Sequence, residues 1–152
     1  MPPDAVHSIR AYLPLSDHIG TGGQPTAEQF DALRDSGYEI VINLALPTST
    51  YALPDERGVV DARGMRYIHI PVDFDVPSAD DARAFFEAMD AAAGRKVFVH
   101  CAMNMRASAF VYLYRTVRQG MDARVAAEDL HRVWTPNPTW QQFLAAAAAA
   151  LA

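Results

Sequence analysis

The sequence predicts an α/β fold, a three-layer sandwich with a mostly parallel central sheet. Three short apolar runs rich in β-branched residues lie at positions 40–44, 67–72 and 97–100. Buried parallel strands have such continuous apolar runs, and segments of helical periodicity separate them here. Strands that alternate with helices indicate parallel pairing with helices on both faces. At 152 residues, the chain is expected to form a single domain spanning positions 1–152.

The N-terminal half is expected to contain two strands and two helices. Thr26 and Gln29 have the spacing of a capping box, which satisfies amide groups at a helix start, and Gly37 is placed to end that helix. The apolar run at 40–44 is a buried strand, and residues 47–54 are expected to form a loop. The predicted elements are a strand over 9–15, a helix from Thr26 to Gly37, a strand over 40–44 and a short helix over 55–63 that ends at Gly64.

The C-terminal half continues the alternation. Ser78 is a good helix cap, Gly94 follows the end of that helix, and Asn137 with Pro138 marks another helix start. The predicted elements are a strand over 67–72, a helix from Ser78 to residue 93, a strand ending at His100, a helix from Met105 or Arg106 to Gln119, a helix from Asp122 to Val133 and a last helix from Asn137.

Composition disfavours several classes of protein. The formal net charge is −5 and no run of lysine or arginine is present, so a partner that is a nucleic acid or a membrane surface is not expected. One cysteine excludes an intrachain disulfide framework, and the scattered histidines have no zinc-site spacing, so neither metal nor cofactor is expected. The first seven residues lack a signal peptide's basic start and apolar stretch, and a cytoplasmic location is expected.

The single cysteine, Cys101, marks the candidate site. It follows the strand that ends at His100 and precedes a helix that begins near Arg106. A loop between a strand and a helix aims backbone N–H groups and the positive end of the helix at one point. Such surroundings favour anions and the thiolate form of cysteine. Ligands of parallel sheets also bind beyond the carboxyl ends of the strands.

The order of strand, His100, Cys101, short loop, Arg106 and helix resembles the cysteine-dependent protein phosphatases. It is most similar to the bacterial phosphatase-like family related to the beta-lactamase-hydrolase-like proteins. Three further stretches carry this resemblance: Gly23-Gln24-Pro25-Thr26, Val41-Ile42-Asn43-Leu44 and Arg106-Ala107-Ser108-Ala109-Phe110. The resemblance extends from about residue 20 to residues 134–140 and implies a cysteine-phosphatase-like fold.

The resemblance also implies a reaction. Cys101 would attack phosphorus as a thiolate and form a phosphocysteine, which water then hydrolyses. Asp73 is the first choice for the general acid and Asp75 the alternative. His100 would orient the loop through hydrogen bonds, and Asn43 would either bond the loop or cap its strand. The expected phosphate-binding groups are the amides of Ala102, Met103, Asn104, Met105 and Arg106, the Arg106 guanidinium and the Ser108 hydroxyl, which would help the thiolate leave.

The spacing between Cys101 and Arg106 departs from that resemblance. Phosphatases of this mechanism have five intervening residues, whereas this chain has four and no glycine among them, so that only Asn104 tolerates a left-handed backbone comfortably. A loop of this length also resembles rhodanese-like sulfurtransferases, in which the thiolate carries a persulfide. A catalytically inactive module that binds phosphate or another anion is the third hypothesis. The leading one is a phosphatase-like hydrolase of a phosphorylated protein or small molecule, with phosphate or sulfate able to occupy the loop.

Overall fold

The computed structural model describes residues 3–152. A five-stranded sheet has the order β1-β2-β5-β3-β4, and only the β1–β2 pair is antiparallel. The strands are β1 (Leu13–Pro14), β2 (Ile19–Gly22), β3 (Ile40–Asn43), β4 (Arg66–His69) and β5 (Val97–His100). The strand that precedes Cys101 is therefore the central strand, paired on both sides. The predicted mostly parallel sheet is confirmed.

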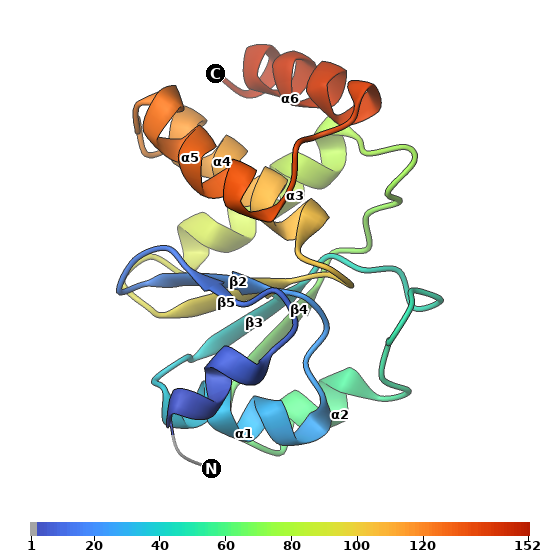
Figure 1. Cartoon of the computed structure of the whole chain (residues 1–152), viewed down its shortest axis with the longest axis vertical. Helices are drawn as coiled ribbons and strands as arrows, with labels where there is room; N and C mark the ends of the chain where they lie inside the picture. Colours follow the sequence, from blue (N-terminus) through green and yellow to red (C-terminus); the bar gives the residue numbers. More distant parts are fainter. Residues whose placement is uncertain (1–2) are drawn as a thin grey trace.

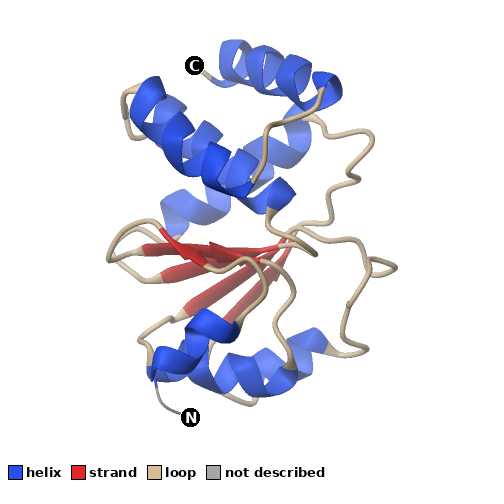
Figure 2. Ribbon diagram, viewed as in Figure 1, coloured by secondary structure: helices blue, strands red, loops and turns tan. Residues whose placement is uncertain are grey.

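Helices cover both faces of the sheet (Figures 1 and 2). One face carries the 3₁₀ helix η1 (Pro3–Ser8), α1 (Ala27–Asp35) and α2 (Glu56–Asp61). The other carries α3 (Ala79–Ala91), α4 (Met105–Val117), α5 (Ala123–Val133) and α6 (Pro138–Leu151). The three layers are those the sequence predicts. Within residues 3–152, no helix is long and apolar enough to cross a membrane.

Local capping signals place the helix starts correctly. Thr26 and Ser78 form complete capping boxes at α1 and α3, and Asn137 caps α6 with its side-chain oxygen. Asp122 likewise accepts the Arg124 amide at the start of α5. These polar side chains satisfy amides that the first helical turn leaves without an intrahelical partner. The same chemistry therefore predicts the boundaries from sequence and stabilises them in the fold.

The predicted first strand is wrong over most of its length. Residues 9–12 form turns, in which the Ile9 amide donates to Val6 and the Tyr12 amide donates to Ile9. Ala11 has a left-handed φ of 51°, which interrupts any extended run before Leu13. Strand β2, by contrast, was not predicted, because two of its four residues are glycines and it therefore has no apolar run.

The sheet separates two apolar clusters. Phe30 and Leu33 of α1 pack with Val41 and Phe98 on one face. The opposite cluster is larger, and its buried aromatic residues are Phe85, Phe86, Phe110, Tyr114, Trp140 and Phe143. Alternate residues of β3, β4 and β5 contribute to opposite clusters, as the pleat requires. Both faces of the strands are thus buried, and the free edge for a ligand is the one where the parallel strands end.

Candidate active site

Cys101 lies directly after β5, at the carboxyl edge of the sheet. Its side chain is 1% exposed and belongs to the apolar cluster beneath α3–α6. Its amide donates to Gly22 O at 3.3 Å, which continues the pairing with β2 by one residue. Met103 and Met105, farther along the loop, are 43% and 36% exposed. The thiol is therefore at the floor of the loop, with the two methionines at its surface.

The loop turns at Asn104, whose φ of 67° lies in the left-handed region. This confirms the expectation that Asn104 supplies the left-handed position in a loop without glycine. Its Nδ2 donates to Ala11 O at 2.9 Å and to Thr21 Oγ1 at 3.0 Å. Asn104 is fully buried, so these two bonds fix the turn from within the protein. The chain can then enter α4 at Met105.

Several amides of the loop point away from protein acceptors. Within residues 3–152, the N–H groups of Ala102, Met103, Met105 and Arg106 have no acceptor. The last two belong to the first turn of α4, where amides have no intrahelical partner. Successive unpaired N–H groups and a helix N-terminus together favour a bound anion.

Arg106 lies in the first turn of α4, with its side chain almost fully buried. Its Nη1 donates to Val72 O at 3.0 Å and its Nη2 approaches Ser49 Oγ at 3.4 Å. No carboxylate within residues 3–152 lies at ion-pair distance from it. The guanidinium is held by neutral groups from the loops after β3 and β4, so its charge is not neutralised by the protein.

The two candidate acids lie on the loop that Arg106 holds. Asp73 follows Val72 directly, and both Asp73 and Asp75 are exposed. Asp73 Oδ1 accepts the Asp75 amide at 2.9 Å, which closes a local turn. Between them, Phe74 packs against Trp134 and Trp140, and its carbonyl accepts the Trp140 indole N–H at 2.8 Å. The loop is thereby anchored to α6 with both carboxylates directed to its exposed side.

Ser108 and Asn43 make local bonds. The Ser108 hydroxyl donates to Met105 O at 3.1 Å, one turn earlier in α4. Asn43 donates from Nδ2 to Tyr67 Oη at 3.0 Å and accepts the Ala45 amide at 2.9 Å. Of the two roles considered for Asn43, these contacts are those of a strand-end cap.

Beneath the loop lies a buried ion pair, part of which the sequence did not reveal. His100 is fully buried between Phe30 and Phe98, and its Nε2 lies 2.6 Å from Glu56 Oε2. Glu56 Oε1 accepts from Gln24 Nε2, also at 2.6 Å. Burial raises the pKa of Glu56, but the charge of His100 and the hydrogen bonds from His100 and Gln24 outweigh it and hold that pKa below its ordinary value.

The sequence did not predict a role for Glu56. It lies 44 residues from His100, and a single acidic residue in a short helix does not indicate a buried contact. Gln24 lay within a stretch that carried the resemblance, but the sequence assigned it no role. The structure also explains the neighbouring Gly23, because a Cβ there would lie 2.5 Å from Ala102 O. Glycine is thus required where β2 continues alongside the cysteine loop.

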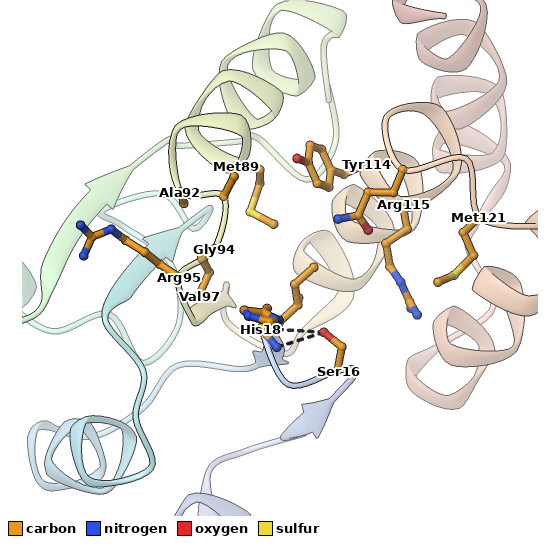
Figure 3. A pocket seen from close by; sticks show the side chains of 13 residues that line it. Ser16, His18, Met89, Ala92, Gly94, Arg95, Val97, Tyr114, Arg115 and Met121 are labelled. Carbon is orange, nitrogen blue, oxygen red and sulfur yellow. Dashed lines mark hydrogen bonds between the residues drawn. The ribbon is translucent and has the colours of Figure 1, made fainter.

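A separate cavity lies at the amino ends of the parallel strands, opposite the end that carries Cys101 (Figure 3). It has a volume of about 310 Å³ and is lined by residues including Ile19 and Val97, the first residues of β2 and β5. Because β5 enters the sheet at Val97 and leaves it at His100, this cavity and Cys101 lie at opposite ends of one strand. It is not part of the candidate site.

Comparisons with known proteins agree with this geometry. Residues 15–144 match the family described as "DSP-PTPase phosphatase fused to NAD+ Kinase". A search of curated protein sequences gave no match. The structure is similar to that of a phosphatase-family protein (DUF442) from Shewanella putrefaciens CN-32, with 37% identity, 97% of each chain covered and a TM-score of 0.87.

More distant structures share the fold. TpbA of P. aeruginosa is 20% identical over 92% of this chain and 87% of its own, with a TM-score of 0.74. Tk-PTP is 18% identical over 91% of this chain and 97% of its own, with a TM-score of 0.77. These likenesses show the phosphatase fold that the order of elements around Cys101 had indicated. The chain therefore belongs to the DSP-PTPase family of phosphatases, a family of cysteine-dependent, protein-tyrosine-phosphatase-like proteins.

Proposed function

We propose that this protein hydrolyses phosphate monoesters through a phosphocysteine formed on Cys101. The observation that carries the proposal is the convergence of unpaired amides and an unneutralised guanidinium on the loop that follows Cys101. Four amides of residues 102–106 have no acceptor within residues 3–152, and Arg106 has no carboxylate partner there. A phosphoryl group has the charge and the oxygen atoms to accept from all of them.

In the first step, the Cys101 thiolate attacks phosphorus and a P–S bond forms as the P–O bond to the leaving group breaks. Asp73 donates a proton to the departing oxygen, so the product leaves as a neutral alcohol or phenol. The loop amides and Arg106 stabilise the charge on the equatorial oxygens. Asp75 is the alternative acid, since both carboxylates are on the exposed side of the same anchored loop.

In the second step, water attacks the phosphocysteine. The aspartate, now ionised, accepts a proton from water as the P–O bond forms and the P–S bond breaks. Phosphate leaves and the thiolate is regenerated. The reaction is balanced by one water per ester and needs no redox partner.

The four-residue spacing is compatible with an anion-binding loop for a physical reason. Asn104 makes the left-handed turn that glycine often makes elsewhere, and its buried side chain holds that turn through Ala11 and Thr21. The helix then begins at once, so Arg106 is already in its first turn. A shorter loop thus keeps its donors close to the helix N-terminus, where the dipole favours negative charge.

The natural substrate belongs to the same proposal. TpbA has been solved in complex with pTyr and PTPMT1 in complex with PI(5)P, at 17% and 18% identity to this chain. Both ligands present a phosphate monoester. We therefore infer a phosphorylated protein or small molecule as substrate, with inorganic phosphate or sulfate able to occupy the loop.

The comparisons favour phosphatase chemistry over the two alternatives, sulfur transfer and inactive anion binding. A paired assay on the wild-type chain and Cys101→Ser separates all three. One arm measures phosphate released from an aryl phosphate, and the other measures thiocyanate formed from thiosulfate and cyanide. We expect phosphate release that falls by several orders of magnitude in Cys101→Ser. Thiocyanate without phosphate would establish the sulfurtransferase, and phosphate binding without either product the inactive module.

A further inference from the structure

Glu56 is a carboxylate with little access to solvent, and each of its two oxygens has a hydrogen-bond partner. It is 6% exposed and accepts from His100 Nε2 and Gln24 Nε2, each at 2.6 Å. These partners come from the end of β5 and from the segment after β2, whereas Glu56 itself belongs to α2. One carboxylate therefore ties together three segments that are distant in sequence.

The two partners of Glu56 also hold the first two carbonyl groups of the cysteine loop. His100 Nδ1 lies 3.1 Å from Cys101 O. The backbone amide of Gln24 donates to Ala102 O at 3.0 Å. Both carbonyls are thus turned toward the layer that contains Glu56. Within residues 3–152, no side chain other than that of Glu56 is hydrogen-bonded to both His100 and Gln24.

Peptide geometry converts the direction of a carbonyl into the direction of the next amide. A trans peptide is planar, and its C=O and N–H bonds point in opposite directions. With Cys101 O directed at His100, the Ala102 N–H is directed away from it. With Ala102 O directed at Gln24, the Met103 N–H is likewise directed away. These are two of the amides that have no acceptor within residues 3–152.

We propose that Glu56 is the positioning residue that aims the Ala102 and Met103 amides at the anion bound by the cysteine loop. It does so through His100 and Gln24 and touches neither substrate nor Cys101. The inference rests on the proposed function, in that the anion is the phosphoryl group of the substrate. It explains why a carboxylate is buried close to a loop that has to attract negative charge.

The charges around Glu56 support this role. The two ring nitrogens of His100 face Glu56 Oε2 and Cys101 O, so His100 bridges the carboxylate to the first carbonyl of the loop. Because Glu56 faces His100 and accepts from Gln24, it repels an anion in the loop less than an unpaired carboxylate would. Tyr67 and His69 of β4 are the other titratable groups that act on Glu56.

The test uses the full chain with inorganic phosphate as probe. Calorimetry measures phosphate affinity, and ¹⁵N–¹H NMR measures the Ala102 and Met103 amide resonances with and without phosphate. In Glu56→Gln, we expect affinity to fall about tenfold and both resonances to move in the absence of phosphate. Glu87→Gln removes an exposed carboxylate of α3 and should change neither. Unchanged amide resonances in a folded Glu56→Gln protein would overturn the proposal.

Two further variants separate positioning from general stability. Gln24→Ala keeps the backbone donor to Ala102 O but frees it from Glu56, so it should move the Met103 resonance more than that of Ala102. His100→Asn should do the reverse, and Glu56→Gln should add little to the Ala102 shift in that background. Equal, additive shifts at both amides would contradict the proposal. If the wild-type chain bound no phosphate, the proposed function would fail, while the phosphate-free resonances would still decide the role of Glu56.

Discussion

The Arg106 guanidinium donates from Nη1 to the carbonyl oxygen of Val72 at 3.0 Å. Val72 immediately precedes Asp73, so this one bond links the helix that follows Cys101 to the loop that carries both candidate acids. The bond uses one side of the guanidinium fork. It therefore couples the position of the Arg106 guanidinium to that of the loop that carries Asp73 and Asp75.

Arg106→Lys keeps the charge but loses the fork. A lysine ammonium cannot bind Val72 O and two phosphoryl oxygens with fixed geometry. We expect kcat/KM for an aryl phosphate to fall about 10²–10³-fold, largely through kcat. Arg124→Lys, on the exposed surface of α5, is the matched control and should leave both constants unchanged. An Arg106→Lys enzyme with near wild-type kcat would remove the arginine from the proposed machinery.

Asp73→Asn and Asp75→Asn identify the general acid. An acid must be protonated to act, so its ionisation produces the limb of the pH–rate profile on which activity falls as pH rises. We expect Asp73→Asn to lower kcat and flatten that limb. Asp75→Asn should retain it, because Asp75 contributes to the loop turn chiefly through its amide. The reverse result would assign the acid to Asp75.

Asn104→Ala should destabilise the protein more than Asn104→Gly. Both remove the hydrogen bonds to Ala11 and Thr21, which together contribute about 1–3 kcal/mol. Both residues have to adopt φ 67° at this position, but only alanine is strained there, at an extra cost of about 1–2 kcal/mol. Urea unfolding of the two variants measures the difference. Equal midpoints would mean that the turn relaxes when the side chain is lost.

Gly23→Ala tests the close approach of two backbones. Its Cβ would lie 2.5 Å from Ala102 O, so the cysteine loop must shift, and we expect KM to rise and stability to fall. Gly64→Ala is the control for the backbone strain that alanine has at a positive φ without a steric contact. Gly64 has φ 75° and open space around its Cβ position, so its alanine variant should lose about 1 kcal/mol of stability with unchanged KM. Kinetics and urea unfolding of both variants separate the two effects.

The buried Glu56 should make stability depend on acidity. Its pKa is lowered in the folded protein from an ordinary 4.5, so the ionised form stabilises the fold above that pH. This contribution is lost as pH falls through the lower, folded pKa. We therefore expect Glu56→Gln to be less stable than wild type at pH 7 and the gap to narrow toward pH 3. Urea unfolding midpoints of both proteins across this range measure the difference in stability. A difference that grew as the pH fell would contradict the lowered pKa of Glu56.

Much of this protein is determined by local sequence. The capping residues Thr26, Ser78 and Asn137 bond to amides three residues away, so their effect can be predicted without knowing the fold. The left-handed turn at Asn104 is equally local, since no other residue of the loop tolerates it as well. The place of Cys101 between a buried strand and a helix follows from the same short-range patterns.

Only the tertiary structure decided which distant segments meet at the site. The glycine-containing β2 becomes a strand because β5 pairs with it, and residues 9–12 turn where an extended run was predicted. Glu56 reaches His100 because α2 packs beneath the sheet, and Asn43 bonds Tyr67 across β3 and β4. Hydrogen bonds between residues far apart in sequence depend on strand order and helix placement. No local pattern encodes those, because they result from burying the whole chain at once.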